Sequence, residues 1–328
     1  MNIVGDIIYN VAIFFIMMIP GIILKMTKMA DGGIGKGLSN LVLYIAQPAL
    51  IFVSYLRDFS VEILINALYV LALSFVVHLI FTFLAKLFYK TAPDRMRRML
   101  EFATILSNAA FMGIPLISVV LESTFPGATL YASIYNITFN IFLWSVGVRI
   151  CTAGKDRDEN GISDHVDEKW LKKGIIKALL HPVSIAAYLG LIVFCFSLHS
   201  YLPAIITDSL GRLQGLVAPL SMVVLGLRFV DVDFKRVLKD KFMYIFLVAR
   251  HLALPILTVG LIKLLVLAGL PLSEVVIKAV VIMVSAPAAT SATMFAEKYD
   301  CDSAYVSGLV AVSTLVSILT MPLVMMLV

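Results

Sequence analysis

The sequence predicts an all-α integral membrane protein, and three observations support this fold class. The 328 residues have a mean hydropathy of +0.99 and only 14% are charged, so they carry far more apolar surface than one water-exposed core buries. Apolar runs of about 20 residues, the length that crosses a bilayer core about 30 Å thick, recur between short charged segments. The basic residues also concentrate in alternate loops, as membrane insertion requires.

These apolar runs predict ten membrane-spanning helices. Their approximate ranges are 3–25, 38–56, 61–88, 99–121, 128–150, 175–198, 205–227, 242–267, 275–297 and 303–327. The first run lacks the basic segment and the small-residue cleavage site of a signal peptide. We therefore expect it to stay in the mature protein.

Lysine and arginine are distributed unevenly between the two sides of these spans. The loops after spans 1, 3, 5, 7 and 9, with the adjoining span ends, hold 21 of the 26 basic residues. The positive-inside rule places these loops in the cytoplasm and both termini outside the cell membrane. Because this topology explains the net charge of +5, we expect no nucleic-acid partner.

The cysteines and the central polar segment carry no chemical motif. Cys151, Cys195 and Cys301 have neither CxxC nor histidine spacing, so we expect no disulfide framework, no metal site and no cofactor. Residues 153–173 mix both charge signs, which is typical of a solvated linker. This linker would join the two halves of the chain, residues 1–152 and 174–328.

The two halves share short sequence features. The segments AQPALIFVSYLR and VAPLSMVVLGLR both contain a proline and end in Leu-Arg, and an offset of 171 relates Pro48 to Pro219. A second offset, of 178, relates Ser107 to Ser285. Because each half would contain five spans, an odd number, the second half would enter the membrane from the opposite side. The pattern predicts two inverted five-helix repeats, with a chance coincidence as the alternative.

Spans 4 and 9 contain residues that interrupt a helix. In ATILSNAAFMGIPLI, Pro115 removes a helical hydrogen bond and clashes with the carbonyl of Phe111, and Gly113 loosens the same turn. Pro287 has the same effect in span 9. In hydrocarbon, freed backbone groups persist only where they face protein or a watery cavity. Paired broken helices are typical of a transporter's binding site, although a kink without function is the alternative.

The candidate substrate-binding residues lie at these breaks and in spans 2 and 7. They are Gln47, Pro48, Ser107, Asn108, Phe111, Gly113, Pro115, Pro219, Ser285, Pro287, Thr290 and Ser291. The positive ends of broken helices favour an anion, and the amide of Asn108 offers both a donor and an acceptor.

The distribution of charge within the spans also favours an anionic substrate. No acidic residue lies near the middle of a span, whereas a cation carrier usually holds its ion with a buried carboxylate. Arg250 lies about 13 Å along span 8, near the midplane. We expect its partner to be either the backbone carbonyls freed at the two breaks or the substrate's own carboxylate. His78 and His251 are candidates for proton coupling, with hydrogen bonding between helices as the alternative, which we favour for His78.

An enzyme, a channel or sensor, and a sodium-coupled symporter are the alternatives to such a carrier. The sequence has no GxSxG, no HExxH and no aspartate near the middle of a span, so we do not expect an enzyme. A channel or ligand sensor on the same fold stays open. So does a sodium-coupled organic anion symporter of the bile acid type.

Four segments carry a family resemblance: IPGIILK in span 1, LYIAQPALIF in span 2, SNAAFMGIPL in span 4 and SAPAATSATMFAEKYD in span 9. They resemble the auxin efflux carrier family, which includes plant PIN carriers and bacterial permeases for malate and malonate. The resemblance covers essentially the whole chain, and it implies that spans 4 and 9 cross as broken helices. It also implies a scaffold of spans 1, 2, 6 and 7, which often dimerises, and a transport unit of spans 3–5 and 8–10 that moves as an elevator. The long central loop of the plant carriers is missing, so its regulation is not implied.

Overall fold

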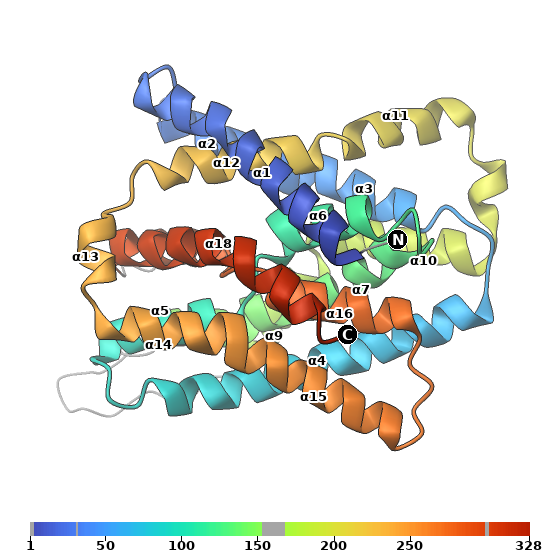
Figure 1. Cartoon of the computed structure of the whole chain (residues 1–328). Coiled ribbons are helices and arrows are strands. Elements are labelled where there is room, and N and C mark those ends of the chain that lie inside the picture. The colour runs from blue at the N-terminus through green and yellow to red at the C-terminus, as the bar shows by residue number, and fades with distance from the viewer. Residues whose placement is uncertain (1–2, 31, 153–167, 299–301) are drawn as a thin grey trace.

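The computed structural model describes residues 3–30, 32–152, 168–298 and 302–328, and these form an all-helical protein (Figure 1). Most of the predicted linker and Cys301 lie outside the described residues. The α-helices are α1 (Ile3–Met26), α2 (Gly32–Leu41), α3 (Gln47–Ser54), α4 (Val61–Phe88), α5 (Asp94–Ile105), α6 (Ile114–Val120), α7 (Ala128–Phe142), α8 (Val148–Thr152), α9 (Glu168–Leu179), α10 (Pro182–Cys195), α11 (Ala204–Gln214), α12 (Val217–Phe229), α13 (Phe234–Leu238), α14 (Lys241–Val248), α15 (Leu254–Leu267), α16 (Glu274–Ser285), α17 (Ser291–Lys298) and α18 (Ser303–Met325). Four π-helical turns, η1 (Val42–Ala46), η2 (Ala109–Gly113), η3 (Leu143–Gly147) and η5 (Ala249–Ala253), and the 3₁₀ turn η4 (Leu198–Tyr201) complete the helical structure of this part of the chain.

Seven helical stretches of the described residues are long and apolar enough to cross a membrane. They correspond to predicted spans 1, 2, 3, 5, 7, 8 and 10. Each of the other three predicted spans falls on two shorter helices: α5 with α6, α9 with α10, and α16 with α17. The all-helical fold is confirmed, and the number of ten spans stays a prediction.

Three of the π turns stand two residues ahead of a proline. η1, η2 and η5 are followed by Pro48, Pro115 and Pro255. In a regular α-helix the proline ring clashes with the carbonyl four residues earlier. Here the residue before each proline donates its N–H five residues back, as Leu254 does to Ala249. The wider turn accommodates the ring, so the helix continues past each proline.

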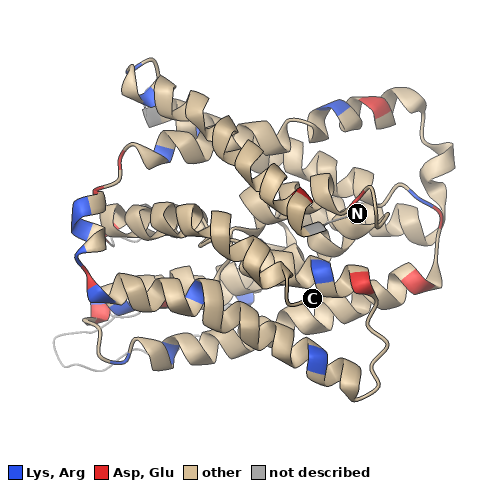
Figure 2. Cartoon of the chain, viewed as in Figure 1, with Lys and Arg blue, Asp and Glu red and all other residues tan. Residues whose placement is uncertain are grey.

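Lysine and arginine residues are concentrated at one end of the helix bundle (Figure 2). Figure 2 shows them mainly around α13 and the connection between α4 and α5, at the left of the view. Both termini lie away from that end (Figure 1). This distribution has the form that the positive-inside rule predicts.

The helix contacts fall into two groups, which α1 also joins by packing on α18 and α6. In the first, α1 packs on α12, and α3 packs on α10 and α11. In the second, α4 packs on α5 and α7, and α16 packs on α7 and α18. η2 contacts both α12 and α16, so the chain that follows the first helix break lies where the two groups meet.

The contact between α1 and α12 depends on two glycines. A Cβ atom at Gly226 would lie 2.1 Å from the carbonyl oxygen of Met18, and one at Gly21 would lie 2.2 Å from that of Val223. Non-bonded atoms do not approach so closely, so these helices need a residue without a side chain at both positions. Small residues permit the same close approach in other membrane helix pairs.

We expect Gly226→Ala to push α1 and α12 apart and to lower the melting temperature of the purified protein by roughly 5 °C or more. Gly211→Ala is the matched control, because a Cβ there meets nothing within 4 Å. The control should leave the melting temperature unchanged or raise it slightly, since alanine favours helix. Equal melting temperatures for the two variants would contradict the close contact.

Candidate functional site

The two helix breaks lie against each other and are joined through the backbone. After α5 and after α16 the chain becomes extended, and an isolated antiparallel β-bridge joins Ser107 to Ala288. The N–H of Asn108 donates to the carbonyl of Pro287 at 2.7 Å. Backbone groups that lose their helical hydrogen bonds at one break thus bond to the backbone of the other break. An apolar environment requires such partners. We call these paired segments, residues 106–108 and 286–290, the crossing.

Arg250, in η5, binds the crossing from one side and is fully buried. Its Nη1 donates to the carbonyl of Thr104 at 3.2 Å, and its Nη2 donates to those of Val284 at 2.9 Å and Ala286 at 2.7 Å. These carbonyls lie at the C-terminal ends of α5 and α16, which carry partial negative charge. Backbone carbonyls, one of the two kinds of partner predicted, therefore hold this guanidinium. A role for Arg250 in charge coupling stays a prediction.

Asn108 places a buried amide at the crossing. Its Oδ1 accepts from the hydroxyl of Thr290 at 3.5 Å, and its backbone carbonyl accepts from the N–H groups of Met112 and Gly113. Its Nδ2 has no hydrogen-bond partner among the residues that the structure describes. A buried donor without a partner costs about 1–3 kcal/mol, so its presence calls for an explanation, and a polar ligand is one.

Two predicted serines lie at the ends of the helices that flank the second break. Ser285 closes α16, Ser291 opens α17, and Thr290 lies between them. The hydroxyls of Ser285 and Ser291 are buried and have no hydrogen-bond partner within the described part of the chain. The crossing therefore contains several buried polar groups that can bind a ligand.

The structure corrects the position of the first interruption. The chain leaves helical geometry at residues 106–108, whereas Pro115 lies in the first turn of α6, where its missing N–H is tolerated. Gly113 ends the π turn η2 and is closely packed, because a Cβ there would lie 2.7 Å from the Sδ atom of Met283, and its part in binding stays a prediction. In the second half, by contrast, Pro287 lies within the break, and Ala286 is extended as a residue before proline should be.

Gln47 connects the first helix group to η2, the turn that follows the crossing. Its Nε2 donates to the carbonyl of Ala110 in η2 at 2.9 Å, over 63 residues of sequence. Beside it, Phe111 packs in a small buried cluster with Val42 and Val224. The structure thus places Gln47 and Phe111 at η2, and their part in binding stays a prediction.

For the two remaining predicted prolines, the structure gives their positions in helices and their burial. Pro48 and Pro219 lie in the first turns of α3 and α12 and are half-buried. Their predicted part in binding stays a prediction.

The two predicted histidines have different surroundings. Nε2 of His251 lies 2.8 Å from the hydroxyl of Ser313, which accepts the N–H of Ala288 in the crossing. Nδ1 of His251 lies 3.0 Å from the hydroxyl of Thr320. These contacts tie η5 to α18. His78 instead contacts the carbonyl of Ser74 in its own helix at 2.7 Å and packs on two aromatic rings.

Comparison with known proteins assigns the chain to a family. A family model described as Membrane transport protein matches residues 6–325, nearly the whole chain. The protein belongs to this family, the auxin efflux carrier family. The chain is also 25% identical over 222 residues to a Methanocaldococcus jannaschii protein named uncharacterized transporter MJ1031, covering 66% of this chain and 67% of that one. The predicted resemblance is confirmed, and the protein is a multi-pass membrane transporter.

Sequence reasoning missed one cation in this auxin efflux carrier family member. Arg228, in the last turn of α12, donates from Nη1 to the carbonyl of Thr290 at 3.1 Å and lines a cavity of about 20 Å³ beside the crossing. The cavity is lined by Met18, Leu225, Arg228, Phe229, Thr290, Thr293, Ser307, Val310, Ala311 and Thr314. This set contains one cation, four hydroxyls and no carboxylate. The available signal was the Leu-Arg pair that ends both span 2 and span 7.

The described residues contain no group of three or more His, Cys, Asp or Glu side chains that could hold a metal ion. The polar chemistry of the crossing consists of amide, hydroxyl, backbone and guanidinium groups.

Proposed function

We propose that the protein is a secondary carrier that moves a small organic carboxylate across the cell membrane by alternating access. The observation that carries this proposal is the cavity between Arg228 and the crossing. A carboxylate there would meet a guanidinium, whose planar donors match its two oxygens, and the hydroxyls of Thr290 and Thr293. Thr290 also contacts Asn108, so one polar path joins the cavity to the buried amide.

The cavity is too small for a carboxylate substrate as it stands. A volume of about 20 Å³ holds one water-sized group, so a substrate must widen the cavity as it enters. In an alternating-access carrier, this widening accompanies the movement of one helix group against the other.

The proposed architecture consists of ten spans in two inverted repeats, and it is supported by the meeting of two helix breaks, one from each half of the chain, at the crossing. Adding 181 to Leu106 and Asn108 gives Pro287 and Ala289. The bond from Asn108 N–H to the Pro287 carbonyl therefore maps onto the bond from Ala289 N–H to the Leu106 carbonyl, which measures 2.9 Å. Every antiparallel bridge has this local two-fold relation, so the bonds agree with inverted repeats and do not fix their offset.

The two helix groups agree with a proposed division of the protein into a scaffold and a moving transport unit. Spans 1, 2, 6 and 7 would form a scaffold, through which two copies associate as a homodimer, and spans 3–5 and 8–10 would move as the transport unit. Residues 1–152 and 174–328 would be the two repeats, with both termini outside the cell. Arg250 and His251 would supply charge or proton coupling within the moving unit.

Uptake by the purified protein in liposomes tests the proposal. We expect saturable uptake and counterflow of at least one carboxylate among acetate, lactate, malonate and malate. Arg228→Gln should weaken apparent affinity roughly tenfold, Arg228→Lys should weaken it less, and the exposed Arg212→Gln should not change it.

Three outcomes would overturn or revise this proposal. Uptake of none of these carboxylates would overturn it. Uptake without saturation or counterflow would indicate a channel, and strict dependence on Na⁺ would indicate the symporter alternative.

A further inference from the structure

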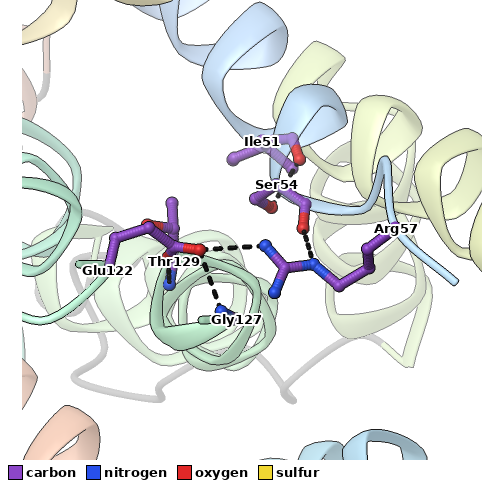
Figure 3. Close-up of polar contacts among 6 residues, drawn as sticks. All are labelled: Ile51, Ser54, Arg57, Glu122, Gly127 and Thr129. Carbon is purple, nitrogen blue, oxygen red and sulfur yellow. Dashed lines mark hydrogen bonds and ion pairs between the residues drawn. The ribbon is translucent and has the colours of Figure 1, made fainter. Parts of the chain in front are cut away.

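Arg57 and Glu122 join two segments that lie 65 residues apart in sequence. Arg57 follows α3, and Glu122 follows α6 (Figure 3). Nη2 of Arg57 lies 2.9 Å from Oε1 of Glu122, and both side chains are partly buried. This ion pair lies at the end of α4 opposite to the basic loops, because α4 spans about 42 Å between residues 61 and 88.

Each partner is also anchored to its own segment. Nε of Arg57 donates to the carbonyl of Ser54 at 2.9 Å, which holds the guanidinium against α3. Oε1 and Oε2 of Glu122 accept the N–H groups of Gly127 and Thr129, each at 2.8 Å, at the start of α7 (Figure 3). Both anchors persist if the segments separate, so the Arg57–Glu122 bond is the one that has to break.

The space at Gly127 and the ionisation of Glu122 both favour the Arg57–Glu122 ion pair. Gly127 has a φ of +103°, and a Cβ there would lie 3.0 Å from Nη1 of Arg57, so glycine leaves room for the guanidinium. Burial by itself raises the pKa of the Glu122 carboxyl, but the N–H groups of Gly127 and Thr129 and the Arg57 guanidinium outweigh it and hold that pKa below its usual value. Glu122 is therefore ionised at neutral pH.

We propose that the Arg57–Glu122 pair is a separable latch that keeps the end of the carrier opposite to the Arg228 cavity closed. This inference rests on the proposed function, because it needs α3 in the scaffold and α6 and α7 in the moving unit. In the present structure the latch is closed while the cavity lies beside α12. Opening the closed end then requires the ion pair to break once in each transport cycle.

The rates of cysteine labelling in detergent test the latch without any substrate. In a variant with the three native cysteines replaced, one reporter is Ser133→Cys, a buried α7 residue whose hydroxyl contacts that of Tyr55 across the latched end. The other is Thr293→Cys, in the Arg228 cavity. Arg57→Gln should raise the labelling rate at residue 133 roughly threefold to tenfold and lower it at residue 293.

Further variants separate a latch from local damage. Glu122→Gln should act like Arg57→Gln, and the double variant should show little more than either, because both remove the same bond. Arg57→Lys keeps the charge and should stay closer to the parent. Arg97→Gln, which breaks ion pairs with Asp94 and Glu101 inside one helix, should move neither reporter.

Two results would overturn the latch. One is unchanged labelling at both residues, and the other is a rise at residue 133 without a fall at residue 293, which indicates local fraying. If the labelling rates shift in opposite directions but no carboxylate is transported, the proposed substrate fails and the latch stands.

Discussion

Arg250→Leu should lower the stability of the protein by several kcal/mol and should do so with and without a carboxylate ligand. The substitution leaves the carbonyls of Thr104, Val284 and Ala286 without their charged donor in a buried site. A hydrogen bond from a charged group contributes about 1.5–3 kcal/mol, and an abandoned buried acceptor costs about 1–3 kcal/mol. Removing the guanidinium also leaves the negative ends of α5 and α16 facing each other without a cation.

Thermal unfolding of purified variants measures this effect. Lys263→Gln, an exposed residue of the same predicted span, is the control and should melt like the parent. Arg250→Lys should recover only part of the loss, because a single ammonium replaces a planar fork of donors. If Arg250→Gln instead reduced ligand binding while the empty protein kept its melting temperature, the substrate and not the carbonyls would be the principal partner.

Asn108→Ala should reduce carboxylate binding roughly tenfold to a hundredfold, with only a small change in melting temperature. The side chain loses a 3.5 Å contact to Thr290 that contributes little to stability. Its Nδ2 has no partner in the described part of the chain, so its removal leaves no protein acceptor unpaired. Calorimetry or thermal shift with a transported carboxylate gives the affinity.

Two matched variants make the Asn108 test specific. Asn108→Asp keeps the shape but adds a negative charge, so it should bind an anion even more weakly than Asn108→Ala does. Asn66→Ala removes another buried asparagine, from α4, and should lower stability without changing affinity. Parental affinity in Asn108→Ala would remove this residue from the binding site, and tighter binding in Asn108→Asp would contradict an anionic substrate.

Local sequence patterns predict much of the helical fold. Long apolar runs appear as helices because a backbone in lipid must satisfy its own hydrogen bonds. Pro287 ends α16 because the residue before a proline avoids helical geometry, as Ala286 does. Pro115 has the same chemistry but lies after a π turn, and only the register of η2 shows that the helix continues there. A proline alone therefore does not locate a break.

Composition and neighbours along the chain are enough to predict that this protein is helical, crosses a membrane and has polar residues inside two apolar runs. Which groups meet depends on packing between segments that are far apart in the sequence. Arg250 reaches a carbonyl 146 residues away, and Arg57 reaches a carboxylate 65 residues away. The sequence left the backbone carbonyls and the substrate equally open as partners for Arg250, because a buried charge is satisfied by whichever acceptor packing brings within hydrogen-bond distance. Packing brings the ends of α5 and α16 there, and it places Arg228 beside the crossing.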